Sequence, residues 1–137
     1  MSFSDPEHSF AEEVLISGEK IRSEVAGEDV SRHKALTLNS SGEVVQTDDA
    51  ADFYGVCAYD RVSGQEVAVI QDDCEVKVIG GEAGITEGDA LEPDASGDFV
   101  QVAAGDEVNQ VAVARTSGGD GDVIEAYITD VTGVTSA

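Results

Sequence analysis

The chain has no tryptophan, few aromatic residues (5%) and only seven Lys and Arg side chains among its 137 residues. The shortage of aromatic rings removes the stacking surfaces that sugar-cleaving enzymes commonly use, so a glycosidase is not expected. The shortage of cations leaves no basic face to neutralise phosphates, which argues against a nucleic-acid partner. The sequence also lacks an apolar run of membrane-spanning length and a secretory signal, so we expect no membrane partner.

Side chains that could form a catalytic or metal site are also scarce. The only histidines are His8 and His33, and no set of partners in the sequence converges on either, so both are expected at the surface. Residues 118–122 resemble one unit of a calcium-binding glycine–aspartate repeat, but the unit occurs once and lies where a hairpin turn is required. The sequence therefore predicts no enzyme, no cofactor and no metal site.

The two cysteines, Cys57 and Cys74, both lie in predicted strands. Their ordinary role there is that of small buried hydrophobic residues. A disulfide is geometrically allowed if their strands are neighbours, but the sequence does not give the distance. Both alternatives stay open at this point.

Negative charge is what the chain has in excess. It carries 29 acidic side chains against seven basic ones, a formal net charge of −22. The 41% apolar content, rich in Val and Ile, indicates a folded protein rather than a disordered acidic chain. Self-repulsion at this charge is screened in concentrated salt, where the screening length falls to about 3 Å at 1 M. The composition therefore predicts a protein of a halophile, or of a virus that infects one, with a merely acidic cytosolic protein as the alternative.

The charge is unevenly distributed along the chain. Residues 1–34 hold eight acidic and four basic groups, a net of −4, whereas residues 35–137 hold 21 acidic and three basic groups, a net of −18. The N-terminal part is therefore the part that another acidic surface would repel least.

A weakened internal repeat relates residues 36–56 to residues 91–111. Six positions are identical at a constant offset (97 − 42 = 55): Leu36, Ser41, Gly42, Val45, Gln46 and Val56 recur as Leu91, Ser96, Gly97, Val100, Gln101 and Val111. Self-similarity of this kind identifies the unit of architecture. In the second copy, Gln110 aligns with Gly55, which predicts looser packing, and Pro93 suggests an edge strand.

The pattern around the repeat predicts an all-β fold, a small antiparallel barrel or sandwich built from two related β-hairpin units with an N-terminal arm. Apolar and polar residues alternate with period two between turns rich in Gly, Asn and Asp. We expect strands near residues 21–25, 35–38, 43–46, 53–59, 65–70, 74–79, 90–92, 98–102, 110–115 and 123–128. The predicted organisation is a flexible arm at 1–18, a single β domain at 19–130 and a C-terminal tail at 131–137.

Four motifs follow one another along the first half of the chain. They are Ala26-Gly27, a hairpin through Gly42, Tyr54-Gly55-Val56-Cys57, and Ser63-Gly64-Gln65-Glu66 leading into a Val-rich strand. Their order resembles that of the capsid decoration (cement) proteins of tailed viruses whose shells have the HK97-type lattice. The resemblance covers about residues 25–79 and again 84–128, and the segment 35–81 is similar to the head decoration protein of lambda-like phages. Together with the charge, the resemblance implies a virus of a halophilic archaeon.

The resemblance also implies a function. It implies a non-enzymatic structural protein that binds the outer surface of a viral capsid as a homotrimer, at three-fold or quasi-three-fold positions, and stabilises the shell. The partners would be the major capsid protein and further copies of the chain, and the location the virion. The alternative is a cellular halophilic β-barrel module that binds a cation or a protein partner, and a small hydrolase ranks last.

In such families the N-terminal segment commonly reaches onto the shell, often by adding a strand to a capsid sheet. Residues 1–24 are therefore the expected capsid-contact arm. The candidate contact residues are Val14, Leu15, Ile16, Lys20, Ile21 and Arg22.

Overall fold

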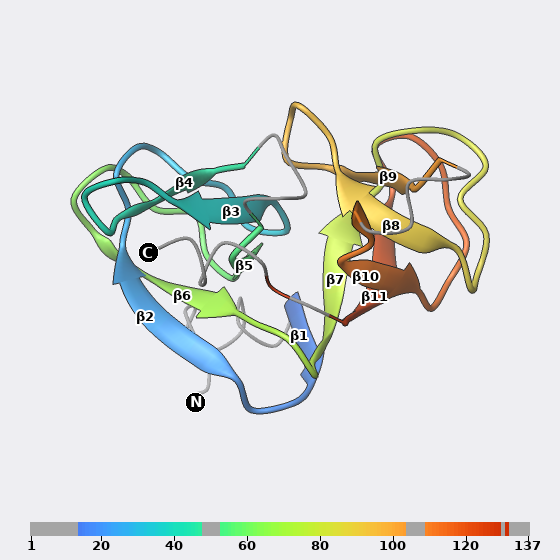
Figure 1. Cartoon of the computed structure of the whole chain (residues 1–137), viewed down its shortest axis with the longest axis horizontal. Helices are drawn as coiled ribbons and strands as arrows, with labels where there is room; N and C mark the ends of the chain where they lie inside the picture. Colours follow the sequence, from blue (N-terminus) through green and yellow to red (C-terminus); the bar gives the residue numbers. More distant parts are fainter. Residues whose placement is uncertain (1–13, 48–52, 104–108, 130, 132–137) are drawn as a thin grey trace, which may run out of the picture.

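The computed structural model describes residues 14–47, 53–103, 109–129 and 131, and it confirms an all-β fold made of two antiparallel sheets (Figure 1). Most strands follow the predicted alternation because at least one of their faces is buried, whereas β1 and β2 are largely exposed. They are β1 (Leu15–Ser17), β2 (Ile21–Val25), β3 (Ala35–Leu38), β4 (Val44–Gln46), β5 (Gly55–Cys57), β6 (Glu66–Ile70), β7 (Glu75–Ile79), β8 (Ala90–Pro93), β9 (Phe99–Gln101), β10 (Ala112–Ala114) and β11 (Val123–Ile128).

The two sheets share one five-strand plan. The order is β2-β6-β5-β3-β4 in one sheet and β7-β11-β10-β8-β9 in the other, with β1 added on the outside of β7. We call the β2–β6 unit lobe 1 and the β7–β11 unit lobe 2; Figure 1 shows them side by side. The internal repeat is thus a repeat of whole lobes, larger than the hairpin that the sequence shows.

The hairpin turns of the two lobes have the same hydrogen bonds. Asn39 Oδ1 accepts the N–H groups of Ser41 and Glu43 at 2.9 and 3.0 Å, and Asp94 Oδ1 accepts those of residues 96 and 98 at 2.8 and 3.0 Å. Gly42 and Gly97 have φ angles of 78° and 79°, which glycine adopts without strain. The short side chain of Asn or Asp therefore fixes each turn.

The register shows where the gapless alignment of the repeat ends. Leu36 pairs with Gly55 in lobe 1, and its counterpart Leu91 pairs with Ala112 in lobe 2. The offset is 91 − 36 = 55 before β5 but 112 − 55 = 57 from β5 on, so lobe 2 has two more residues between these strands. The structural counterpart of Gly55 is therefore Ala112, and the expectation built on Gln110 is wrong.

Pro93 is also placed differently from the prediction. Its strand, β8, lies between β10 and β9 rather than at an edge. However, β10 pairs only with Ala90 and Leu91, whereas Pro93 pairs with Phe99 of β9. Proline is tolerated here because it stands beyond the part of β8 that β10 reaches.

Each lobe curls back on itself. The residues that follow β2 and β7 form isolated parallel bridges, Ala26 with Val44 and Gly80 with Phe99. Gly27 N–H donates to Val44 O, and Gly81 N–H donates to Phe99 O, both at 2.8 Å. These contacts join the first strand of a lobe to its third, so each sheet closes partly into a barrel.

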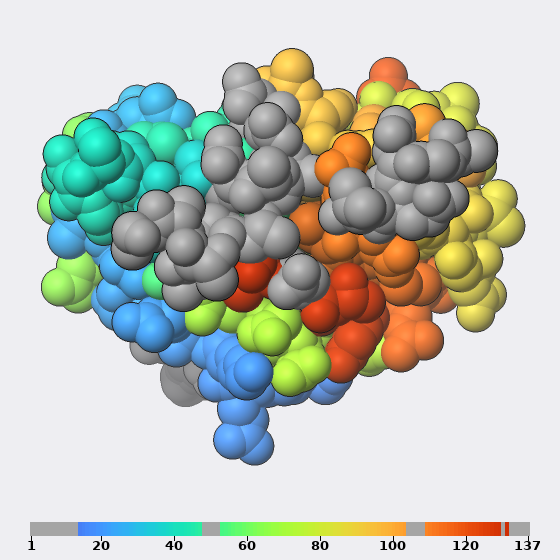
Figure 2. Space-filling view, in the orientation of Figure 1, coloured from blue at the N-terminus to red at the C-terminus, as the bar shows by residue number. Residues whose placement is uncertain are grey.

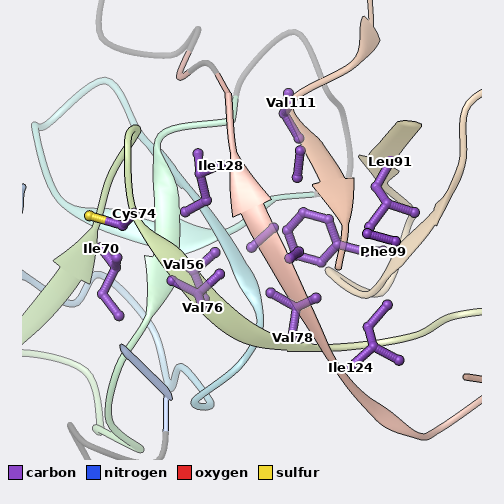
Figure 3. Close-up of a cluster of buried hydrophobic side chains, with 14 of the residues drawn as sticks. Val56, Ile70, Cys74, Val76, Val78, Leu91, Phe99, Val111, Ile124 and Ile128 are labelled. Atoms are coloured by element: carbon purple, nitrogen blue, oxygen red, sulfur yellow. The ribbon is translucent and has the colours of Figure 1, made fainter. Parts of the chain in front are cut away.

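The buried side chains of the described residues form two hydrophobic clusters. The larger one spans both lobes, and Figure 3 shows side chains from β5, β7, β8, β9 and β11 converging in it. Within it the rings of Phe53 and Phe99 meet edge to face, with centroids 5.9 Å apart. The smaller cluster lies within lobe 1 and includes Leu36, Tyr54 and Cys57. The shared cluster fixes the lobes to each other, since its side chains come from both.

The hairpin turn of lobe 2 also docks on lobe 1. Ala35 N–H donates to Gly97 O at 2.9 Å, and the Lys34 ammonium donates to Ser96 O at 3.2 Å and to Asp98 Oδ1 at 2.5 Å. Both charged side chains of this ion pair are about four-fifths buried. We call these interactions the lobe contact.

Several predicted features are decided here. His33 is half-buried rather than a free surface residue, because its Nδ1–H donates to Lys77 O at 2.9 Å. Cys57 and Cys74 are separate buried thiols, not a disulfide. Residues 118–122 form the turn before β11, as predicted. Residues 1–13 of the predicted arm, with His8, and residues 132–137 of the predicted tail lie outside the described part of the chain.

Candidate docking surface

Residues 14–25 lie at the edge of both sheets. β1 pairs antiparallel with β7 at the end of the six-stranded sheet, and β2 pairs with β6 at the end of the five-stranded sheet. Gly18 connects them in close contact with Cys74, where a Cβ atom would lie 2.6 Å from the Sγ atom. From Val14 on, the segment assigned to the arm is therefore part of the β body. We call residues 14–25 the edge segment.

The six predicted contact residues divide into two groups. Val14 is fully buried and Leu15 packs partly against the core, so these two hold the segment in place. Ile16 and Ile21 are 40% and 45% exposed, and Lys20 and Arg22 are exposed beside them. In Figure 2 this blue part of the chain forms the lower margin of the molecule.

The Lys20 ammonium interacts with two carboxylates of the loop before β7. It lies 3.2 Å from Asp73 Oδ2 and 3.5 Å from Asp72 Oδ1. The hydrogen bond with Asp73 raises the pKa of Lys20, and the same bond lowers the pKa of Asp73, which also accepts the Tyr127 hydroxyl at 3.0 Å. Lys20 therefore joins the edge segment to lobe 2, although so exposed a pair stabilises the fold little.

Arg22 belongs to a second charged group. Its Nε lies 3.5 Å from Glu24 Oε2, and the Tyr54 hydroxyl donates a hydrogen bond to the same carboxylate. Burial, together with this bond to Glu24, raises the pKa of Tyr54 to about 12. The group ties β2 to the interior of lobe 1.

The edge segment carries no net charge. Glu19 and Glu24 balance Lys20 and Arg22, whereas the whole chain has a net charge of −22. The side chains of Ile21, Ser23 and Val25 share one face of β2 by the two-residue period, and Val25 is 37% exposed. A neutral, partly apolar strip thus lies on an otherwise acidic protein, where another acidic protein would meet the least repulsion.

The outer side of β2 is open to a further strand. Gln71 N–H donates to Lys20 O, and Ala26 N–H donates to Gln65 O, both at 2.8 Å. Because successive residues of an antiparallel strand bond alternately to the two sides, the backbone groups of Ser23 point away from β6. Among the described residues, no strand of the sheet pairs with that side of β2, although β4 reaches it just beyond the strand's end, where Ala26 bridges Val44. The counterpart strand in lobe 2, β7, has β1 paired on the same side.

Chemistry other than docking has little support in the described part of the chain. No group of three or more His, Cys, Asp or Glu side chains there is arranged to hold a metal ion. The Cys57 thiol is buried and donates to Tyr59 O at 2.9 Å, and burial raises its pKa to about 12, so it stays protonated and unreactive at neutral pH. No helix of the described residues is long and apolar enough to cross a membrane.

Sequence reasoning located part of this surface and missed the rest. Ser23 and Val25 were left out, although their alternation with Arg22 and Glu24 is readable in the sequence. The open side of β2 has no local signal, because it depends on which strands pair with β2 and β7.

Comparisons with known proteins bear on the fold. No protein-family model matches the sequence, and no curated protein matches it. Among solved structures, the chain is similar to the head fiber gp8.5 N base of bacteriophage phi29, with a TM-score of 0.64 and 19% sequence identity. The match covers 80% of this chain and 92% of that one. At this identity the likeness is one of fold.

Proposed function

We propose that the protein is a non-enzymatic structural protein of a virion that binds the outer surface of a viral capsid. The observation that carries the proposal is the shared fold with the phi29 head fiber base, which covers nearly the whole of that chain. The resemblance of the sequence to capsid decoration proteins points the same way. The charge of −22 separately supports the proposal of a halophilic host.

Binding to the shell is assigned to the edge segment. It offers an open strand side, exposed Ile16, Ile21 and Val25, and no net charge. A strand of the capsid protein that pairs with β2 would gain backbone hydrogen bonds and cover these apolar side chains. A homotrimer at a three-fold position would present this contact three times, and linked contacts raise the overall affinity.

The test is cosedimentation of the full chain with shells assembled from the major capsid protein of the same virus, in about 3 M salt to screen the acidic surfaces. The test variant combines Ile21→Ser and Val25→Ser, which removes the apolar side chains beside the open strand. The control combines Val62→Ser and Val123→Ser. These valines are more exposed than Ile21 and Val25, at 55% and 53%, but lie outside the edge segment. We expect the test variant to stay in the supernatant and the control to sediment with shells.

Two further results bear on the proposal. Ser23→Pro removes an N–H that points away from β6, so it should abolish shell binding without unfolding the protein. Deleting residues 1–24 is not a suitable test, since it removes β1 and most of β2 from the body. Undiminished binding of both edge variants would show that another surface holds the shell, and failure of the wild-type chain to bind shells would refute the function itself. Light scattering in the same salt measures the molar mass of the free protein, which should be that of a trimer.

A further inference from the structure

Lobe 1 contains a socket that lobe 2 fills. The socket consists of Lys34, Ala35 and Gln46, and the lobe contact places the turn of residues 94–98 in it. Gly97 lies so close to Gln46 that a Cβ atom there would be 2.8 Å from the Gln46 Cγ atom. The Gln46 backbone is held in turn by Glu28, whose Oε2 accepts its N–H at 3.0 Å. A glycine turn, an N–H donor and a buried ion pair thus define the socket.

Lobe 2 has the corresponding site, and none of the described residues fills it as residues 94–98 fill the socket of lobe 1. The counterparts of Lys34, Ala35 and Gln46 are Asp89, Ala90 and Gln101. Glu82 corresponds to Glu28, since its Oε2 accepts the Gln101 N–H at 2.7 Å. These positions line a cavity of about 400 Å³, formed by Glu82, Asp89, Ala90, Gln101, Val102 and Ala103.

The charge of the site is reversed between the lobes. Lys34 in lobe 1 meets an acidic residue of the docked turn, Asp98. Asp89 takes the place of Lys34 in lobe 2. Its Oδ2 accepts the Gln101 side-chain amide at 2.6 Å and the Thr86 N–H at 2.7 Å, and these neutral donors leave its negative charge uncompensated. The residue complementary to Asp89 is therefore basic.

We propose that this cavity is a docking site for a glycine-containing turn of a partner protein that carries Lys or Arg directly after the glycine. The turn would enter as residues 94–98 enter lobe 1. Its glycine would lie against Gln101, its carbonyl would accept the Ala90 N–H, and its cation would pair with Asp89. The site is separate from the edge segment and does not depend on capsid binding.

A second copy of this chain is not the occupant. Its free turn at residues 39–43 has the required shape, since it matches residues 94–98 in every turn hydrogen bond described above. However, Glu43 stands after its glycine and would meet Asp89. Two carboxylates brought together in a partly buried site repel each other, so the wild-type chain does not dock on itself here.

The first test uses two disulfide-closed hairpin peptides. One copies residues 91–101, and the other is the same peptide with the Asp98→Lys change. We expect the lysine peptide to bind the full chain at least about tenfold more tightly than the aspartate peptide, by fluorescence anisotropy, which corresponds to about 1.4 kcal/mol. Asp89→Lys in the full chain should reverse the preference, and Asp89→Asn should remove it. Equal binding of both peptides, or of neither, would overturn the proposal.

The second test needs no peptide. In the Asp89→Lys chain, the new lysine of one copy can pair with Glu43 in the turn of another copy, as Lys34 pairs with Asp98 in the lobe contact. The average mass of this variant in light scattering should therefore rise with concentration above that of the wild type, as head-to-tail association requires. Adding Glu43→Lys should return the mass to the wild-type value. If the Asp89→Lys chain, folded by circular dichroism, keeps the wild-type mass, the cavity is not a turn socket.

Discussion

At the scale of single residues, Tyr54 shows how a buried hydroxyl positions an edge strand. Its ring lies in the core of lobe 1, and its hydroxyl donates to Glu24, one of the residues of β2. Glu24 also interacts with Arg22, so one carboxylate joins the interior to the exposed edge. The strand that we assign to shell binding is therefore held by a charged hydrogen bond as well as by its pairing with β6.

Tyr54→Phe should lower the free energy of unfolding by about 2 kcal/mol at neutral pH, because it leaves Glu24 without its hydroxyl donor. The pKa of Tyr54 is raised from 10.0 to about 12 in the folded protein. The unfolded chain therefore loses this proton first, and the stabilisation is complete below pH 10 and lost as the pH rises toward 12. Urea unfolding of both proteins from pH 7 to 12 measures the difference, which should shrink across that window. A difference that is constant with pH would contradict the assignment.

At the scale of strands and turns, the two lobes show what the sequence could reveal. The strands and hairpin turns were predictable because their signals are local: alternation along β3 and β4, and Asn39 or Asp94 starting a turn that glycine completes. The two-residue shift before β10 could not be predicted in this way. It is defined by the pairing of Leu91 with Ala112, which are 21 residues apart (112 − 91). The lobe contact was hidden for the same reason, since Lys34 and Asp98 look like ordinary surface charges in the sequence.

Gly55 and its counterpart Ala112 should respond differently to substitution, because only Gly55 lacks room for a Cβ atom. A Cβ atom at Gly55 would lie 2.5 Å from Val69 Cγ1 and 2.6 Å from Ile70 O, so Gly55→Ala should destabilise the protein by about 2 kcal/mol or more through overpacking. The matched change in lobe 2, Ala112→Gly, removes one methyl group and should cost about 1 kcal/mol. Chemical denaturation of both variants gives the comparison. Equal costs would mean that the two positions are not packed differently.

At the scale of the whole molecule, charge and architecture have separate roles. The shared hydrophobic cluster and the lobe contact fix the lobes together, whereas many of the described acidic side chains are exposed. The ion pairs of Lys34 with Asp98 and of Arg115 with Glu75 offset only a small part of a net charge of −22. The stability of the protein should therefore depend on the solvent ions.

Lowering the salt from about 3 M to about 0.1 M should lower the melting temperature, because repulsion among the carboxylates is then no longer screened. Thermal unfolding followed by circular dichroism at several salt concentrations measures the shift. Chloride salts of two different cations distinguish general screening, which affects both alike, from binding of one cation. Equal melting temperatures at low and high salt would remove the inference of a halophilic origin.

The pairing of β1 with β7 has a consequence for the order in which the chain can fold. During synthesis from the N-terminus, all five strands of lobe 1 have emerged once Ile70 has left the ribosome, so this lobe can fold early. β1 precedes every one of these strands, yet its partner strand β7 is made after them. The earliest strand of the chain therefore stays without its partner until β7 has been made, after every strand of lobe 1.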